Sequence, residues 1–220
     1  MASVAPVAPV APVAMSGDSV HATTAVGSAE RLKEVSQCTT LVHDAVTTET
    51  ADEALAFVKA IPAGMWRAFR NSSRGRKNRC DFGRSNQMVP PVLVRLMREA
   101  IDSAYIANED IPHGFDLETV CIKTYSPGEG ISKHKDEKKD HALVFGVTLC
   151  IDDIYDNRVM RFTPDAVAEP KKQLLSSHRS VHVFWGSAYT HAKHEQLKSK
   201  WRQRGRIVSF TARMKRRNSL

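Results

Sequence analysis

The strongest indication of the fold is the segment Tyr125-Ser-Pro-Gly-Glu-Gly-Ile-Ser-Lys-His134-Lys-Asp136, which lies between two long runs of strand-forming residues. Its proline and two glycines predict a tight turn, after which the chain is extended again. Alternate residues of an extended segment point the same way, so His134 and Asp136 can bind one cation together. One imidazole and one carboxylate, joined by a distant second histidine, form the facial triad that leaves positions open on a non-haem iron.

Segments on both sides of this stretch are predicted to be strands, because they are rich in apolar and β-branched residues and are separated by turn-forming residues. They are Phe115–Tyr125, Ala142–Ile151, Val159–Phe162, Lys172–Ser176, Val181–Trp185 and Ile207–Ala212.

Helical patterns come earlier in the chain. A short strand is predicted at Thr40–Val46, then one helix that begins at Thr50 and includes Ala54–Ile61, and a second helix after Pro90. In that second helix apolar residues repeat at three-to-four spacing as far as Tyr105. Helices followed by six or more strands predict an α+β domain whose β part closes as a barrel or sandwich.

The C-terminal half completes the motif. Val181–Trp185 is followed by Gly186 and Tyr189-Thr-His191-Ala-Lys-His194, and later by Gly205-Arg206-Ile-Val-Ser209-Phe-Thr211-Ala-Arg213. Together with the Tyr-x-Pro-Gly turn and the HxD pair, this order resembles the AlkB family of Fe(II)/2-oxoglutarate dioxygenases, over Phe115–Arg213. The resemblance implies a double-stranded β-helix (jelly-roll) core braced by N-terminal helices, with Fe(II), 2-oxoglutarate and O₂ as cofactor and co-substrates.

The resemblance also implies the ligands. Iron would be held by His134, Asp136 and a second histidine. His194 is favoured because it lies nine residues after Trp185, the interval expected in the family, and His191 is the alternative. The histidine that does not bind iron would be a surface residue or would orient the ligand.

Four residues are expected to bind 2-oxoglutarate. Arg213 ends the Ser-x-Thr-x-Arg pattern and would bind the end nearest to iron, and Tyr125 and Lys123 would assist. The family has a second arginine six residues before Arg213, where this chain has an isoleucine. Arg206 is therefore expected to bind the remote carboxylate, provided that a bulge near Val208 corrects its direction, and Arg204 is the alternative.

A basic segment, Trp66–Arg84, is predicted to be a loop that binds substrate. Its candidate contact residues are Trp66, Phe69, Arg76, Arg79 and Phe82. Aromatic side chains among arginines suit an unpaired base and its phosphates, although they could equally anchor a solvated loop to the core.

The expected reaction is oxidative demethylation or dealkylation of bases in DNA or RNA, as in repair. The alternatives are the same chemistry on a protein or small molecule, or a nucleic-acid-binding protein with a degenerate site. Repair enzymes of the family often have an acidic residue two positions after the HxD aspartate, where this chain has Lys138. The choice of base therefore stays open.

Composition sets the remaining expectations. The net charge of +8 over 220 residues favours an anionic partner such as nucleic acid. The scattered positions of four cysteines predict a reducing compartment, cytoplasmic or nuclear, with organelle targeting still possible. No apolar run approaches membrane-spanning length, and we expect a monomer. The repeated Ala-Pro-Val unit predicts an unpacked tail over residues 1–28, then a catalytic domain over 29–213 and a basic tail over 214–220.

Overall fold

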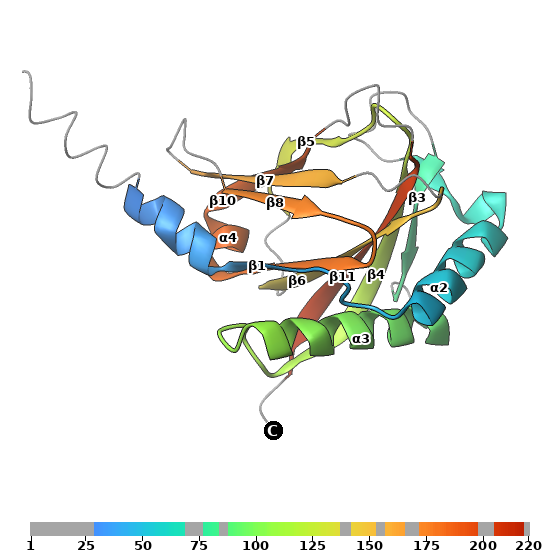
Figure 1. The fold of residues 1–220 in the computed structure, drawn as a ribbon, viewed down its shortest axis with the longest axis horizontal. Helices are drawn as coiled ribbons and strands as arrows, with labels where there is room; N and C mark the ends of the chain where they lie inside the picture. Colours follow the sequence, from blue (N-terminus) through green and yellow to red (C-terminus); the bar gives the residue numbers. More distant parts are fainter. Residues whose placement is uncertain are drawn as a thin grey trace, which may run out of the picture.

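The computed structural model describes residues 29–68, 77–83, 88–136, 142–152, 157–165, 172–197 and 205–217. Within them, two antiparallel sheets face one another, and helices cover the outer side of the larger sheet (Figure 1). The predicted tail of residues 1–28 lies outside the described part of the chain.

The larger sheet of the described chain has seven strands in the order β1-β9-β6-β11-β4-β3-β2. Their bounds are Thr39–Val42 (β1), Arg67–Ala68 (β2), Lys77–Phe82 (β3), Phe115–Tyr125 (β4), Leu143–Cys150 (β6), Ser180–Trp185 (β9) and Ile207–Arg216 (β11). The smaller sheet has the order β5-β10-β7-β8 and consists of Ile131–His134 (β5), Arg158–Pro164 (β7), Lys172–Ser176 (β8) and Ala192–Gln196 (β10). From β4 onward the chain passes back and forth between the sheets, which is the jelly-roll arrangement that the sequence predicted.

Two helices brace the larger sheet, also as predicted. Helix α2 (Thr48–Ala60) begins after Thr47, whose hydroxyl oxygen accepts the backbone N–H of Thr50 at 3.2 Å. Helix α3 (Pro91–Ala107) begins with a proline, which loses no helical hydrogen bond at that position. Their buried residues form one core with the outward face of β6, β9, β11 and β4. The opposite face of the same sheet is thereby left for the site.

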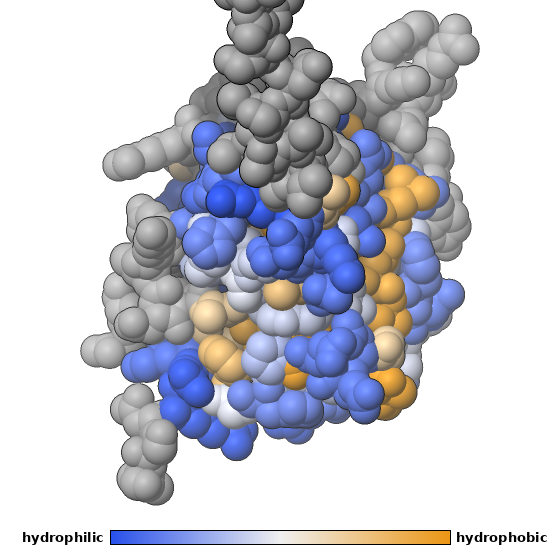
Figure 2. Space-filling model, turned by 90° about the vertical axis from the view of Figure 1, so that its left-hand side faces the viewer, coloured by the Kyte–Doolittle hydropathy of each residue, from blue (hydrophilic) through white to orange (hydrophobic). Residues whose placement is uncertain are grey.

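A third helix, of residues 29–37, and the short α4 (Gly186–Thr190) lie at the far end of the molecule. The face that carries them is mostly hydrophilic (Figure 2). No helix in the described ranges combines the length and the apolar character that a membrane crossing requires.

Some predicted boundaries were wrong. The short strands β5 and β10, which carry His134 and His194, were not predicted as strands, because each has few apolar residues. The basic segment is not a loop throughout, since it contains β2 and β3. Strand β11 runs to Arg216, so the start of the predicted basic tail belongs to the sheet.

Candidate metal centre

Three side chains with metal-binding groups converge in the space between the sheets. His134 ends β5 and lies opposite His194 of β10 in the antiparallel register, with ring centroids 4.4 Å apart. Asp136 follows two residues later, with its Oδ1 atom 3.9 Å from Nε2 of His134. One ligand atom from each of the three residues lies within 4.8 Å of the other two. Two imidazole nitrogens and one carboxylate oxygen fit a divalent transition metal such as Fe(II).

The ring of His134 is oriented by its own strand. Its Nδ1 lies 2.8 Å from the carbonyl oxygen of Ser132. Because a carbonyl can only accept, Nδ1 carries the proton and Nε2 is left as the ligand atom.

Lys135, between the two ligands in sequence, fixes the segment from the other side. Its ammonium pairs with the carboxylate of Asp165 and donates to the carbonyl oxygen of Thr190 at 3.1 Å. Asp165 directly follows β7, and Thr190 ends α4. The HxD segment is therefore tied to elements on the far side of β10, the strand that carries His194.

Burial and nearby charges favour the protonation states that metal binding needs. Burial alone would raise the pKa of Asp136, but His194, Arg213 and His134 hold it below its ordinary value. The Nη2 atom of Arg213 lies 3.5 Å from Oδ1 of that carboxylate. Burial lowers the pKa of the His194 imidazole to about 3. An ionised carboxylate and a neutral imidazole are the forms that bind metals.

A cavity extends from the cluster between the sheets. On the larger sheet it is lined by alternate residues of β4 and β11, which include Lys123, Ser209, Thr211 and Arg213. On the smaller sheet it is lined by residues that include Met160 and Gln196. Its volume of about 40 Å³ admits little more than a water molecule. A five-carbon dianion would therefore require long side chains, such as those of Lys123 and Arg213, to move aside.

Tyr125 and Lys123 both line this cavity, as the sequence analysis expected of residues near a bound anion. Tyr125 is 3% exposed and packs with Ile131, Cys150 and Ile207 at the end away from Asp136. Burial raises the pKa of the Tyr125 phenol, so it is a neutral hydrogen-bond donor at pH 7. Burial lowers the pKa of the Lys123 ammonium.

Arg206 is not where its predicted role requires it. Its guanidinium is 58% exposed and pairs with Asp152 at 2.7 Å, and it does not line the cavity. The bulge expected near Val208 is absent, because β11 keeps its register from Ile207 to Arg213 and shifts only after Arg213. The other candidate, Arg204, lies outside the described residues. His191 is exposed at the end of α4 and lies outside the cluster that contains His194.

Among its described residues, the basic segment contributes one predicted residue to the cavity side of the sheet. Arg79 lies opposite Lys123 on the neighbouring strand, and its guanidinium forms a bidentate pair with Asp81. Phe82 is only 4% exposed and packs in the helix-side core against Phe57, so it cannot contact a substrate as predicted. Trp66 also packs against that core. Phe69 and Arg76 lie outside the described residues.

Two residues of the interior were missed by the sequence analysis. His182 lies in the middle of β9, lines the cavity, and has a buried Nδ1 with no hydrogen-bond partner among the described residues. Arg158 begins β7 and is 1% exposed. Both could have been found because each shares one face of its strand with large apolar residues, His182 with Phe184, and Arg158 with Met160 and Phe162, which indicates a buried face.

No protein-family model matches the sequence, and no curated protein matches it. Solved structures do match. The structure of OsALKBH1 is similar with a TM-score of 0.61 and 11% identity, over 80% of this chain and 97% of that one. A Pseudomonas putida prolyl-4-hydroxylase is similar with a TM-score of 0.52 and 15% identity, over 86% of this chain and 98% of that one. The chain therefore has the fold of an AlkB homologue and of a prolyl hydroxylase, as the resemblance in its motifs implied.

Proposed function

We propose that this chain is an Fe(II)- and 2-oxoglutarate-dependent dioxygenase that removes alkyl groups oxidatively from nucleic-acid bases. The observation that carries the proposal is the convergence of His134, Asp136 and His194 at one end of a cavity between the two sheets. Three protein ligands on one side leave the other side of a metal open for a co-substrate and O₂. The fold shared with OsALKBH1 and the prolyl-4-hydroxylase supports the dioxygenase chemistry in this proposal, but not the choice of substrate.

The chain's own residues have distinct roles in this proposal. When bound, Fe(II), 2-oxoglutarate and O₂ supply the oxidation of a substrate C–H bond, and the protein supplies position and shielding. Arg213, beside Asp136, offers positive charge to the keto-acid end of the co-substrate. Phe162 and Phe184, with ring centroids 6.0 Å and 5.1 Å from that of His194, exclude water from one side of this ligand.

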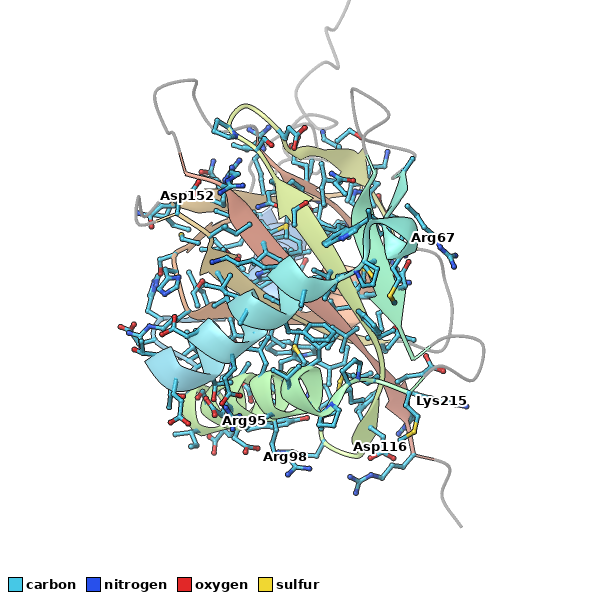
Figure 3. All side chains as sticks on the ribbon, turned by 90° about the vertical axis from the view of Figure 1, so that its right-hand side faces the viewer. Arg67, Arg95, Arg98, Asp116, Asp152 and Lys215 are labelled. Atoms are coloured by element: carbon cyan, nitrogen blue, oxygen red, sulfur yellow. The ribbon has the colours of Figure 1, made fainter. Side chains whose placement is uncertain are left out.

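A row of cations supports nucleic acid as the substrate. Arg67 of β2 pairs with Arg79 of β3, which in turn pairs with Lys123 of β4. Directly paired residues share one face of a sheet, so this row leads from the sheet edge to the cavity. Figure 3 shows Arg67 at that edge, with its side chain in solvent. Asp81 offsets part of the charge of Arg79, but the row remains positive, and phosphates bind such a surface.

A protein substrate is the second candidate, and one observation favours it. The fold is shared with a prolyl-4-hydroxylase as well as with OsALKBH1, although with a lower TM-score, 0.52 against 0.61. Peptide oxidation uses the same metal centre, so only the substrate distinguishes the two reactions.

Co-substrate turnover tests both candidates. The protein is supplied with Fe(II), 2-oxoglutarate and O₂, and succinate is measured with DNA or RNA oligonucleotides that carry 1-methyladenine or 3-methylcytosine, and with proline-containing peptides. We expect methylated oligonucleotides to stimulate succinate formation and to lose their methyl groups, and the Asp136→Ala variant to do neither.

Stimulation by peptides alone would replace the nucleic-acid proposal with the second candidate. Absence of succinate under every condition, with metal bound, would overturn the assignment as a dioxygenase.

A further inference from the structure

A buried arginine lies at the end of the interior away from Asp136. Arg158 has the largest fully buried side chain among the described residues and is 1% exposed. It shares the inner face of β7 with Met160 and Phe162, because alternate residues of a strand point the same way. Phe162 packs near His194, and Met160 lines the cavity. The face thus leads from the metal ligands past Met160 to Arg158, which lies beyond the residues that line the cavity. The Cα atoms of Phe162 and Arg158 are about 13 Å apart along the strand.

The guanidinium of Arg158 is held beside Tyr125. Its Nη1 atom donates to the carbonyl oxygen of Glu129 at 2.9 Å, in the turn that follows Tyr125. The positive charge of Arg158 also acts on the Tyr125 phenol. A guanidinium and a phenol hydroxyl are therefore neighbours at this end, and both are donors that suit a carboxylate.

The opposite strand provides no cation there. Ile207 of β11 lies between Tyr125 and Cys150 in the sheet and is fully buried. It stands six residues before Arg213, where the motif leads one to expect an arginine. Arg206, the neighbouring candidate, pairs with Asp152 outside the cavity.

We propose that Arg158, on β7, binds the remote carboxylate of 2-oxoglutarate together with the Tyr125 hydroxyl, in place of an arginine on the last strand. The inference rests on the proposed function, because it assumes that the keto-acid end of this co-substrate lies at the metal. The five-carbon chain then extends past Met160 toward the buried end. In this proposal the cation for the remote carboxylate comes from the smaller sheet and not from the larger one.

Equilibrium binding tests this without turnover. The Mn(II)-loaded protein is titrated without O₂, by calorimetry, with 2-oxoglutarate and with 2-oxopentanoate, which has the same chain length and no remote carboxylate. We expect the wild type to prefer 2-oxoglutarate strongly. Arg158→Met should weaken 2-oxoglutarate binding about 30-fold or more, since an anchoring ion pair is lost, and should leave 2-oxopentanoate binding unchanged. Mn(II) affinity, measured separately, should not change.

Two further variants keep the test decisive. Arg158→Lys retains the charge but not the planar fork, and it should lie between the wild type and Arg158→Met. The double variant Arg158→Met/Ile207→Arg should recover part of the preference for 2-oxoglutarate, because it returns an arginine to the opposite strand. If Arg158→Met alone does not fold, the preference for 2-oxoglutarate is compared between the wild type and these two variants.

The outcomes separate the two proposals. If the Arg158 variants discriminate between the two acids as the wild type does, or if Arg206→Met abolishes the discrimination instead, then Arg158 is not the anchor and the proposed function stands. If the wild type binds Mn(II) but neither oxo acid, the proposed function fails together with this inference.

Discussion

Gly146 of β6 and His182 of β9 lie directly opposite each other in the larger sheet, and the imidazole occupies the space that a side chain at Gly146 would fill. A Cβ atom at Gly146 would lie 2.1 Å from Nε2 of His182. The absence of that Cβ is therefore what allows His182 to line the cavity beside His194.

Gly146→Ala should displace His182 and destabilise the protein by about 2 kcal/mol, as overpacking in a filled interior does. Urea denaturation measures the effect. Gly64→Ala is the matched control, because a Cβ there meets nothing within 4 Å. The double variant Gly146→Ala/His182→Ala should be less destabilised than the sum of the single variants. Additive losses would mean that the two residues do not share one space.

The two candidate third ligands can be separated by metal binding. His194→Ala should weaken Fe(II) or Mn(II) binding at least about 100-fold, because the cluster loses one of its three protein ligands. His191→Ala should change it less than about twofold, since His191 is exposed and outside the cluster. Calorimetric titration measures both, and the reverse order of effects would reassign the ligand.

The position of the HxD segment should depend on Lys135. Lys135→Met removes the ammonium that pairs with Asp165 and Thr190 but leaves every ligand in place. Metal affinity should fall about 10-fold, the lower range for partners that orient ligands. Lys133→Met, also a neighbour of His134 but exposed, is the control and should bind metal like the wild type. Equal affinities for the two variants would show that the tether does not orient the ligands.

Much of this arrangement followed from the sequence, and the parts that did not have physical reasons. Strand β4 was predicted at its observed bounds, because its apolar residues, its length and the turn that follows it all indicate the same strand. His134 and Asp136 were predicted from the spacing of one extended segment, and His194 from the nine-residue interval after Trp185 that the family resemblance implies. Strands β5 and β10 were missed because the polar residues that serve the site replace the apolar pattern there. Arg206 was chosen by closeness in sequence to Arg213, whereas Arg158 comes from another strand, and sequence spacing contains no information on which strands face each other.

The cation row should govern binding to nucleic acid. Arg67→Glu reverses the outermost charge of the row and should weaken binding to a single-stranded oligonucleotide about fivefold or more at low salt. It should also reduce the dependence of log Kd on log salt concentration by about one unit. Arg98→Glu makes the same change in charge on helix α3, away from strand β2, which carries Arg67 (Figure 3). Fluorescence anisotropy across salt concentrations compares the two. Similar effects from both variants would indicate that net charge, and not this row, attracts the nucleic acid.

His182 should make the stability of the metal-free protein depend on pH. Burial lowers its pKa from 6.5 to about 4 in the folded state. Between these values the unfolded chain takes up a proton that the folded chain does not, so the free energy of unfolding falls as the pH is lowered from 6.5 toward 4. The loss amounts to about 3 kcal/mol, at 1.36 kcal/mol for each pKa unit. His182→Leu should lack this contribution, so that its stability relative to the wild type rises by about that amount between pH 7 and pH 4. Urea denaturation with a chelator present, at intervals across this range, measures the difference. Parallel stability curves for the two proteins would mean that His182 is accessible to protons in the folded state, contrary to its burial.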